Sequence, residues 1–147
     1  MSEAKVIVFP TDFSDASLAA IPWVERLAAV LDADVHCICV VEEPHIIGPY
    51  GVGAISIPSG EELAENTRPH LDEFAAKHFG EISSSSLARV LVGRPADEIV
   101  NYADSLDAAM IIMATHGYSG LKHLVLGSTA EAVLRRAKCP VLSVRSE

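Results

Sequence analysis

The residues best suited to chemistry lie in the last third of the chain, within ATHGYSGLKHLVLGSTAEAVLRRAKCPVLSVR, residues 114–145. Two spaced glycines, Gly117 and Gly120, permit backbone conformations that are closed to other residues. The triplet Gly127–Thr129 then opens a predicted helix, whose first N–H groups have no partner within the helix. N–H groups and hydroxyls at a helix start bind phosphate well. This segment therefore predicts a site for a phosphate-bearing ligand.

The elements that flank this loop are a strand before it and a helix after it. The apolar run Ala108–Ala114 predicts the strand, and an amphipathic pattern predicts a helix from Val125 or Gly127 to Lys138. A last short strand follows over Pro140–Val144. A strand, a glycine-containing loop and a helix start are the arrangement in which backbone amides can surround a phosphate group.

The rest of the chain repeats the alternation of strand and helix. Further strands are predicted over Lys5–Pro10, Asp34–Val41 and Leu87–Val92, and further helices over Asp15–Leu31, Glu61–Phe79 and Pro95–Leu106. Ser14 is a suitable N-cap for the first helix, and Pro22 predicts a bend or a late start within it. Five strands alternating with four helices predict a parallel sheet with helices on both faces, in a single domain over residues 1–147.

Candidate site residues from distant parts of the chain should meet at one edge of this sheet. Asp12, Val40 and the loop 114–120 all follow or end a predicted strand. In open α/β sheets, ligands bind beyond the carboxyl ends of the strands. The Pro- and Gly-containing stretch 42–60 is a long connection, and such loops are binding lids or disordered segments.

Composition excludes several classes of function. The formal net charge of −9 disfavours non-specific nucleic-acid binding, and it requires that any bound anion be held by N–H dipoles or a bridging metal. No apolar run reaches the roughly 18 residues of a membrane span, and the N-terminus has no long apolar signal region. The cysteines Cys37, Cys39 and Cys139 match no zinc or redox spacing, so reduced thiols and a cytoplasmic location are expected.

No catalytic or metal-binding group is predicted. His116 lies in the phosphate loop without an identifiable carboxylate partner, and the other histidines lack metal-ligand spacing. Neither a Gly-x-Ser-x-Gly nucleophile elbow nor a Walker Gly-Lys-Ser/Thr triplet occurs. The sequence therefore favours a binding protein over an enzyme.

Four segments together resemble the universal stress protein family: PTDFS, CVVEE, VGRPADEIV and the phosphate-loop segment described above. The resemblance covers nearly the whole chain. It implies a five-stranded parallel sheet of order 3-2-1-4-5, related to adenine-nucleotide hydrolases. It also implies homodimers that form through the final strand, here residues 140–145. One branch of the family binds ATP, and another lacks the glycine motif and does not.

The ATP-binding branch carries Gly-x-x-Gly, nine residues, and then Gly-Ser or Gly-Thr. In this chain Gly117 matches the second glycine, and Gly127-Ser128 closes the motif. Ala114 replaces the first glycine. An alanine there costs little if its φ is negative, and roughly 1 kcal/mol or more if the site needs a positive φ. Tyr118 stands where relatives often carry a basic residue.

The resemblance also assigns a place to each part of an adenine nucleotide. Asp12 would meet the ribose or adenine region, Val40 would lie against adenine, and residues 113–117 would pass the ribose. The phosphates of ATP, ADP or AMP, bridged by Mg²⁺, would lie at residues 127–129. The full set of expected contacts is Pro10, Thr11, Asp12, Val40, Met113, Ala114, His116, Gly117, Gly120, Gly127, Ser128 and Thr129.

Simpler interpretations remain open at several of these positions. The three glycines can be turn residues, Ser128 can be an N-cap alone, and Asp12 can cap the first helix or bind a backbone amide. Two alternatives to a nucleotide-binding module follow. One is a nucleotide-free interaction protein of the same fold, which acts through its dimer surface and loop 42–60. The other is a weak ATP hydrolase.

Overall fold

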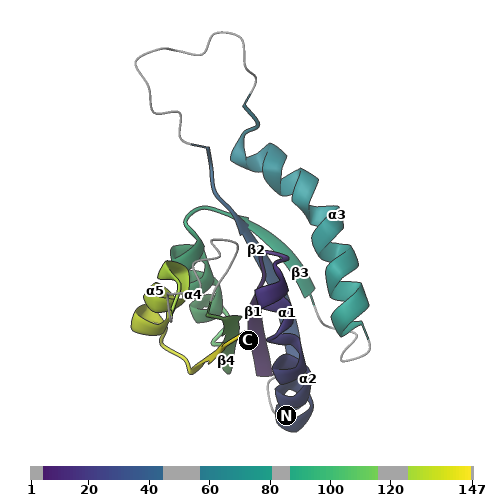
Figure 1. The fold of residues 1–147 in the computed structure, drawn as a ribbon, viewed down its shortest axis with the longest axis vertical. Coiled ribbons are helices and arrows are strands. Elements are labelled where there is room, and N and C mark those ends of the chain that lie inside the picture. Colours follow the sequence, from purple (N-terminus) through teal and green to yellow (C-terminus); the bar gives the residue numbers. More distant parts are fainter. Residues whose placement is uncertain (1–4, 45–56, 81–86, 116–125, 147) are drawn as a thin grey trace.

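A five-stranded parallel sheet lies at the centre of the computed structural model, which describes residues 5–44, 57–80, 87–115 and 126–146. The strand order is β3-β2-β1-β4-β5, and every pair of neighbours is parallel (Figure 1). The strands are β1 (Lys5–Pro10), β2 (Ala33–Val41), β3 (Leu87–Val92), β4 (Met110–Ala114) and β5 (Val141–Val144). This confirms the predicted sheet and its order. The direction of winding reverses between β1 and β4.

Helices cover both faces of the sheet, as predicted (Figure 1). They are α1 (Asp15–Leu18), α2 (Ile21–Leu31), α3 (Gly60–Phe79), α4 (Pro95–Ser105) and α5 (Ser128–Arg136). On one face, α2 packs against β1 and β2, and α3 packs against β2 and β3. On the other face, α4 packs against β2 and α5 against β5. Two separate apolar clusters result, one on each face.

The central strand β1 shows why its sequence is nearly continuous in apolar residues. Ile7 and Phe9 belong to the cluster beneath α2 and α3, whereas Val8 belongs to the cluster beneath α4 and α5. All three side chains are fully buried. Successive residues of a strand point to opposite faces, so a strand covered on both sides must be apolar throughout.

The first predicted helix is divided in two. Ser14 caps α1 by accepting a hydrogen bond from the Ser17 N–H, as its residue type suggested. The chain then turns at residues 19–20, and α2 begins at Ile21 with Pro22 in its first turn. Proline is tolerated there because the first helical N–H groups have no acceptor within the helix. Of the two predicted effects of Pro22, the late start is the one observed.

The helix α3 starts at Gly60 and contains Pro69 in its interior, a feature that the predicted boundaries did not single out. Ser59 and Glu62 form a capping box at its start. Gly60 is needed there because a Cβ atom would lie 2.6 Å from Cγ1 of Val92. Leu71 of this helix is fully buried, and Leu63, Phe74, Ala75 and His78 are half-buried.

The remaining boundaries differ from prediction by one or two residues. The strand β4 begins at Met110 rather than Ala108, because the chain turns through Asp107 at a φ of 47°. The strand β5 begins at Val141, although the Pro140 carbonyl already accepts a hydrogen bond from the Ile111 N–H. Most of loop 42–60 lies outside the described residues. Within the described part of the chain, no helix has the length and apolar character needed to cross a bilayer.

Candidate functional site

A pocket of about 350 Å³ opens at the carboxyl ends of β1, β2 and β4, beside the point where the winding reverses. Nine of the twelve predicted residues line it: Pro10, Thr11, Asp12, Val40, Met113, Ala114, Gly127, Ser128 and Thr129. The other three, His116, Gly117 and Gly120, lie outside the described residues. The structure thus brings residues from three distant segments around one cavity, at the edge where parallel α/β sheets bind ligands.

Four further lining residues were missed in the sequence: Ser17, Pro95, Ile99 and Ala130. A fifth, Thr115, lies within the segment 113–117 that the resemblance placed along the ribose. The segment VGRPADEIV carried a usable signal for two of them. A helix that follows a parallel strand starts at the carboxyl edge of the sheet, so Pro95 at the start of α4 had to lie near Asp12 and Ala114. Ser17 and Ala130 are exposed to the pocket by helix geometry, which a sequence pattern does not specify.

The turn after β1 is fixed by hydrogen bonds of Thr11 and Asp12. The Thr11 N–H donates to the Ile38 carbonyl of β2 at 2.8 Å. The Phe13 N–H donates to Thr11 Oγ1 at 3.0 Å, and the Ser14 N–H donates to Asp12 Oδ1, also at 3.0 Å. These bonds hold Phe13 at a φ of 64°, a conformation that side chains rarely adopt.

Asp12 therefore accepts a hydrogen bond from a backbone amide, as one of the alternatives to ligand binding predicted. That contact occupies one lone-pair site, and a carboxylate can accept up to about four hydrogen bonds. Asp12 also lines the pocket, so binding a ligand hydroxyl remains compatible with its structural contact. It is the only charged side chain among the described lining residues.

The start of α5 forms the opposite wall of the pocket. Gly127 is the N-cap at φ −71° and ψ 158°, which any residue can adopt. Its N–H donates to the Thr115 carbonyl at 2.7 Å, so the sequence-based expectation that the Gly127 N–H is a free donor is wrong. The available donors begin at Ser128, because no side chain caps this helix.

Thr115 connects this wall to the edge of the sheet. Its carbonyl accepts from Gly127, and its own N–H donates to the Val144 carbonyl of β5 at 3.0 Å. The residue is buried and lines the pocket. One residue therefore fixes the position of the α5 start relative to the last strand.

Ala114, which replaces the first motif glycine, sits in β4 opposite Val144. Among the described residues other than glycine, positive φ values occur only at Phe13, Asp32 and Asp107. Ala114 thus has a backbone conformation that alanine adopts without strain. Alanine therefore differs from the motif glycine here only by its methyl group, and the residue lines the pocket.

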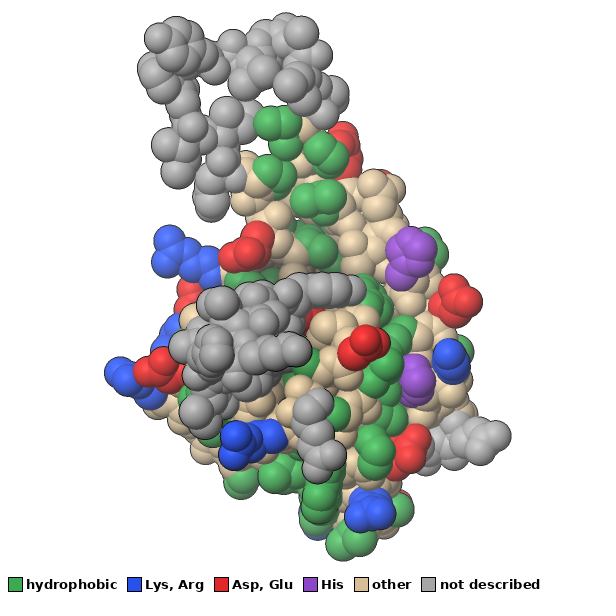
Figure 2. Space-filling model, viewed as in Figure 1, with side chains coloured by type: hydrophobic (Ala, Val, Ile, Leu, Met, Phe, Trp, Pro, Cys, Tyr) green, Lys and Arg blue, Asp and Glu red, His purple; other side chains and the backbone are tan. Residues whose placement is uncertain are grey.

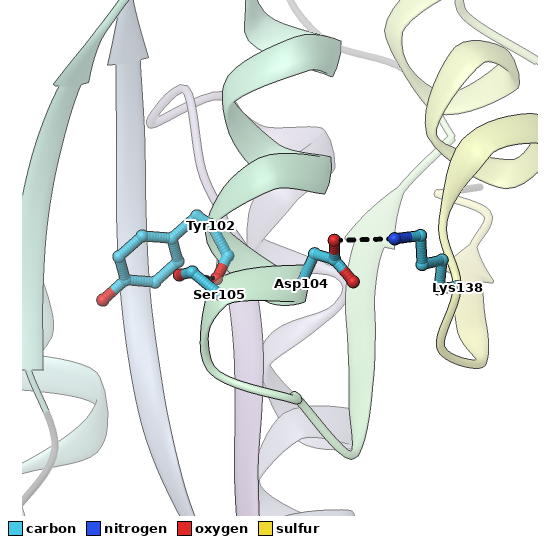
Figure 3. A network of polar contacts seen from close by, with 4 residues as sticks. All are labelled: Tyr102, Asp104, Ser105 and Lys138. Atoms are coloured by element: carbon cyan, nitrogen blue, oxygen red, sulfur yellow. Dashed lines mark hydrogen bonds and ion pairs between the residues drawn. The ribbon is translucent and has the colours of Figure 1, made fainter.

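The helices α4 and α5 supply one side of the pocket, and ion pairs link α4 to the last residue of α5 and to the segment that follows it. Arg136 forms an ion pair with Asp97, and Lys138 Nζ lies 2.9 Å from Asp104 Oδ2 (Figure 3). In Figure 3, Tyr102 and Asp104 point to opposite sides of α4, Tyr102 toward β2 and Asp104 toward Lys138. Exposed pairs of this kind contribute up to about 1 kcal/mol each. They align the two helices more than they stabilise the fold.

The electrostatics of the site do not favour a nucleophile. Burial, with a further contribution from the Asp12 charge, raises the pKa of the Cys39 thiol to about 11. Cys39 therefore stays protonated at neutral pH. In the described ranges, no three His, Cys, Asp or Glu side chains gather closely enough to hold a metal ion. Lys and Arg side chains gather on the α4–α5 side of the face shown in Figure 2.

The fold and pocket define an α/β protein of the kind that binds ligands at the carboxyl edge of its sheet. The sequence profile of the universal stress protein family matches residues 3–145. The chain belongs to this family, which confirms the resemblance seen in the sequence.

Individual members show how close the similarity is. Universal stress protein MJ0531 of Methanocaldococcus jannaschii is 36% identical over 147 residues, which cover 96% of this chain and 82% of the relative. The solved structure of MJ0577 is 26% identical, with a TM-score of 0.72 and coverage of 97% and 96%. MJ0577 is a universal stress protein of the same organism.

Two solved structures of the family contain nucleotides. A universal stress protein in complex with cAMP is 24% identical and has a TM-score of 0.68, over 97% of this chain and 98% of that one. The universal stress protein of Archaeoglobus fulgidus in complex with dAMP is 22% identical with a TM-score of 0.63, at the same coverage. At these levels of sequence identity, the similarity shows a shared fold alone.

Proposed function

We propose that this universal stress protein binds an adenine nucleotide, ATP, ADP or AMP, in the pocket at the carboxyl edge of its sheet. The observation that carries the proposal is the pairing of apolar walls with uncapped helix N–H groups in one cavity. Its volume of about 350 Å³ falls in the range of small-molecule sites. The family members that contain cAMP and dAMP support the choice of ligand.

The proposed pose follows the chemistry of the walls. Val40 and Met113 offer apolar surface to the flat base, and Asp12 accepts hydrogen bonds from the ribose hydroxyls. The N–H groups of residues 128–130 point toward the phosphate, where the positive end of the α5 dipole favours an anion. Each hydrogen bond to a charged oxygen contributes about 1.5–3 kcal/mol.

The acidic character of the chain requires that the phosphate charge be balanced locally. With a net charge of −9, the protein as a whole repels a nucleotide. Mg²⁺ held mainly by the phosphates and water would reduce that repulsion, since this ion keeps several waters and needs few protein ligands. We assign no catalytic residue, and the proposed role is binding in the cytoplasm, with a stress-response or signalling output.

The proposal is tested by denaturing the purified protein and separating the released small molecules by chromatography. Calorimetric titration of the stripped protein with AMP and with Mg-ATP complements this assay. We expect release of an adenine nucleotide, or saturable heat with at least one of the two ligands. Neither release nor heat would contradict nucleotide binding and favour a nucleotide-free interaction protein. Product formation that exceeds that of a Ser128→Asp variant would instead show hydrolysis.

We also propose that the chain forms a homodimer through residues 140–145. The strand β5 is at the edge of the sheet and contains no charged residue, although charged residues commonly protect such edges. Identical edge strands that pair about a two-fold axis satisfy each other's backbone groups. The final-strand dimers expected from the family resemblance support this choice.

Replacing Ser143 by proline is expected to shift the protein from dimer to monomer in sedimentation equilibrium. The carbonyls of Pro140 and Val144 accept hydrogen bonds from β4, so the backbone groups of Val141 and Ser143 point outward. Proline removes one outward N–H and leaves the β4–β5 pairing intact. The Ser143→Ala variant is the control and should remain dimeric. Equal masses for the two variants would contradict an interface through β5.

A further inference from the structure

A buried polar network lies on the opposite half of α4 from the pocket. His36 is on β2, two residues before Ile38, and both side chains belong to the face that α4 covers. The His36 side chain is 8% exposed, and its Nδ1 lies 2.8 Å from the Tyr102 hydroxyl of α4. The two rings lie 5.9 Å apart. This bond therefore joins α4 directly to an inner strand of the sheet.

A third residue favours one direction of the hydrogen bond. The Arg89 guanidinium of β3 forms a hydrogen bond with the Tyr102 hydroxyl, and a guanidinium only donates. The Tyr102 oxygen is therefore an acceptor toward Arg89, and its own proton is free to point to His36 Nδ1. In this arrangement His36 is neutral and carries its ring proton on Nε2.

We propose that the His36–Tyr102–Arg89 network is an acid-sensitive latch, which holds α4 against the sheet and is released when His36 takes up a second ring proton. A protonated Nδ1 becomes a donor that faces the donating hydroxyl of Tyr102. It also places a buried positive charge near the Arg89 guanidinium. Tyr102 must then turn its proton away, and the link between β2 and α4 weakens.

The charges around His36 determine the sign of the pH effect. Burial lowers its pKa, the Asp34 carboxylate on the same strand acts in the opposite direction, and Arg89 on β3 lowers it further. Tyr102 is the facing titratable group on α4, and burial raises its pKa, so it keeps its proton. On the other side, β1 pairs the apolar Val8 with His36, and the charged residue of that strand, Lys5, pairs with Ala33 at the strand start.

The latch therefore contributes stability at neutral pH and loses it under acid. An unfolded or detached His36 takes up a proton near its ordinary pKa of about 6.5, whereas the packed residue does so only at lower pH. Protons thus favour the open state across the interval below about pH 6.5. The contribution is fully present above that value and is lost as the pH falls through it.

The same helix carries one wall of the pocket. Ile99 lies one turn before Tyr102, and Pro95 starts α4 at the pocket edge. Detachment of Tyr102 loosens the helix that positions both residues. The effect on α4 is independent of any ligand, while its consequence for nucleotide affinity rests on the proposed function.

Hydrogen exchange of the full-length protein tests the latch. Between pH 7.5 and 5.5, after correction for intrinsic rates, amides of α4 are expected to exchange up to about tenfold faster, since the open state gains a factor of ten per pH unit below about 6.5. The amides of α2, on the opposite face, should change less. In the His36→Gln variant, which cannot titrate, the acceleration in α4 should disappear. Equal acceleration in α2, or its persistence in His36→Gln, would overturn the proposal.

The matched control is His78→Gln. Burial lowers the pKa of His78 too, but this residue belongs to α3 on the other face of the sheet. This variant should retain the pH response of α4. If it loses the response and His36→Gln keeps it, the wrong histidine has been assigned.

Nuclear magnetic resonance of the His36 ring reports its tautomer and its pKa, which a purely structural packing role of His36 would not determine. At neutral pH, the nitrogen shifts should show the proton on Nε2. The Tyr102→Phe variant keeps the aromatic ring but removes the donor that favours neutral His36, so the pKa of His36 should rise. Arg89→Gln should raise it as well. A proton on Nδ1, or an unchanged pKa in Tyr102→Phe, would contradict the network.

The consequence for the pocket is measured separately by AMP titration at pH 7.5 and 5.5. We expect affinity to fall with acidification in the natural protein and to fall less in His36→Gln. If neither AMP nor Mg-ATP binds at either pH, the proposed function is contradicted, and the hydrogen exchange of α4 still tests the latch. Binding with the same pH dependence in both proteins would overturn the coupling.

Discussion

Replacing Gly127 by aspartate is expected to weaken nucleotide binding strongly while the protein stays folded. The backbone conformation at Gly127 is one that any residue can adopt, and aspartate is a favoured N-cap that bonds first-turn N–H groups. The new carboxylate would occupy the donors proposed for the phosphate and place a negative charge beside it. At about 4 Å and an effective dielectric constant near 20, the repulsion is about 4 kcal/mol. Affinity should fall roughly 100- to 1000-fold.

The matched control is Gly127→Asn, which has nearly the same shape and also caps a helix but carries no charge. Calorimetric titration with AMP should show a much smaller loss for this variant than for Gly127→Asp. Thermal unfolding should show both variants at least as stable as the natural protein, because a capping side chain replaces a glycine. Equal affinity for the two variants would mean that phosphate does not lie at the start of α5.

The alternation of apolar runs and amphipathic patterns was sufficient to predict the sheet, because each layer requires its own periodicity. Residues 5–10 could only be a strand buried on both faces, and β1 is one. The strand order came instead from the family resemblance. The break between α1 and α2 was less predictable, since the proline was visible but its effect depended on where the first turn of the helix would start.

The location of the candidate site was easier to predict from the sequence than its individual contacts. The rule that strands of an α/β sheet present their carboxyl ends together located Asp12, Val40 and Ala114 at one pocket. No comparable rule predicts which groups will form hydrogen bonds with each other. The hydrogen bond from the Gly127 N–H to Thr115 and the unstrained backbone of Ala114 follow only from the folded structure.

The partners of His36 could not be predicted from the sequence either. By type and spacing it looked like one of several histidines without a role, because its partners come from β3 and α4, far away in the sequence. A buried polar group must find a partner within the fold, and the sequence does not say which one. The residue's position on a strand covered by α4 was the only signal, through its alternation with Ile38.

The residue just before the pocket is predicted to have the largest effect on stability. Phe9 is fully buried in the central strand, next to Pro10 at the pocket, and its ring meets that of Phe79 edge-on at 5.5 Å. Replacement by alanine leaves a cavity between β1 and α3. The free energy of unfolding should fall by about 3–5 kcal/mol, measured by urea denaturation.

The exposed aromatic Trp23 provides the control, because its side chain is 45% exposed and forms no part of either apolar cluster. Trp23→Ala should lower the free energy of unfolding by far less than Phe9→Ala, when both are compared as monomers. The Phe79→Ala variant completes a double-mutant cycle with Phe9→Ala. Since the ring pair contributes about 0.5–1.5 kcal/mol beyond burial, the two losses should not add. Strict additivity would mean that β1 and α3 are stabilised independently, and that the α3 end does not support the strand leading to Asp12.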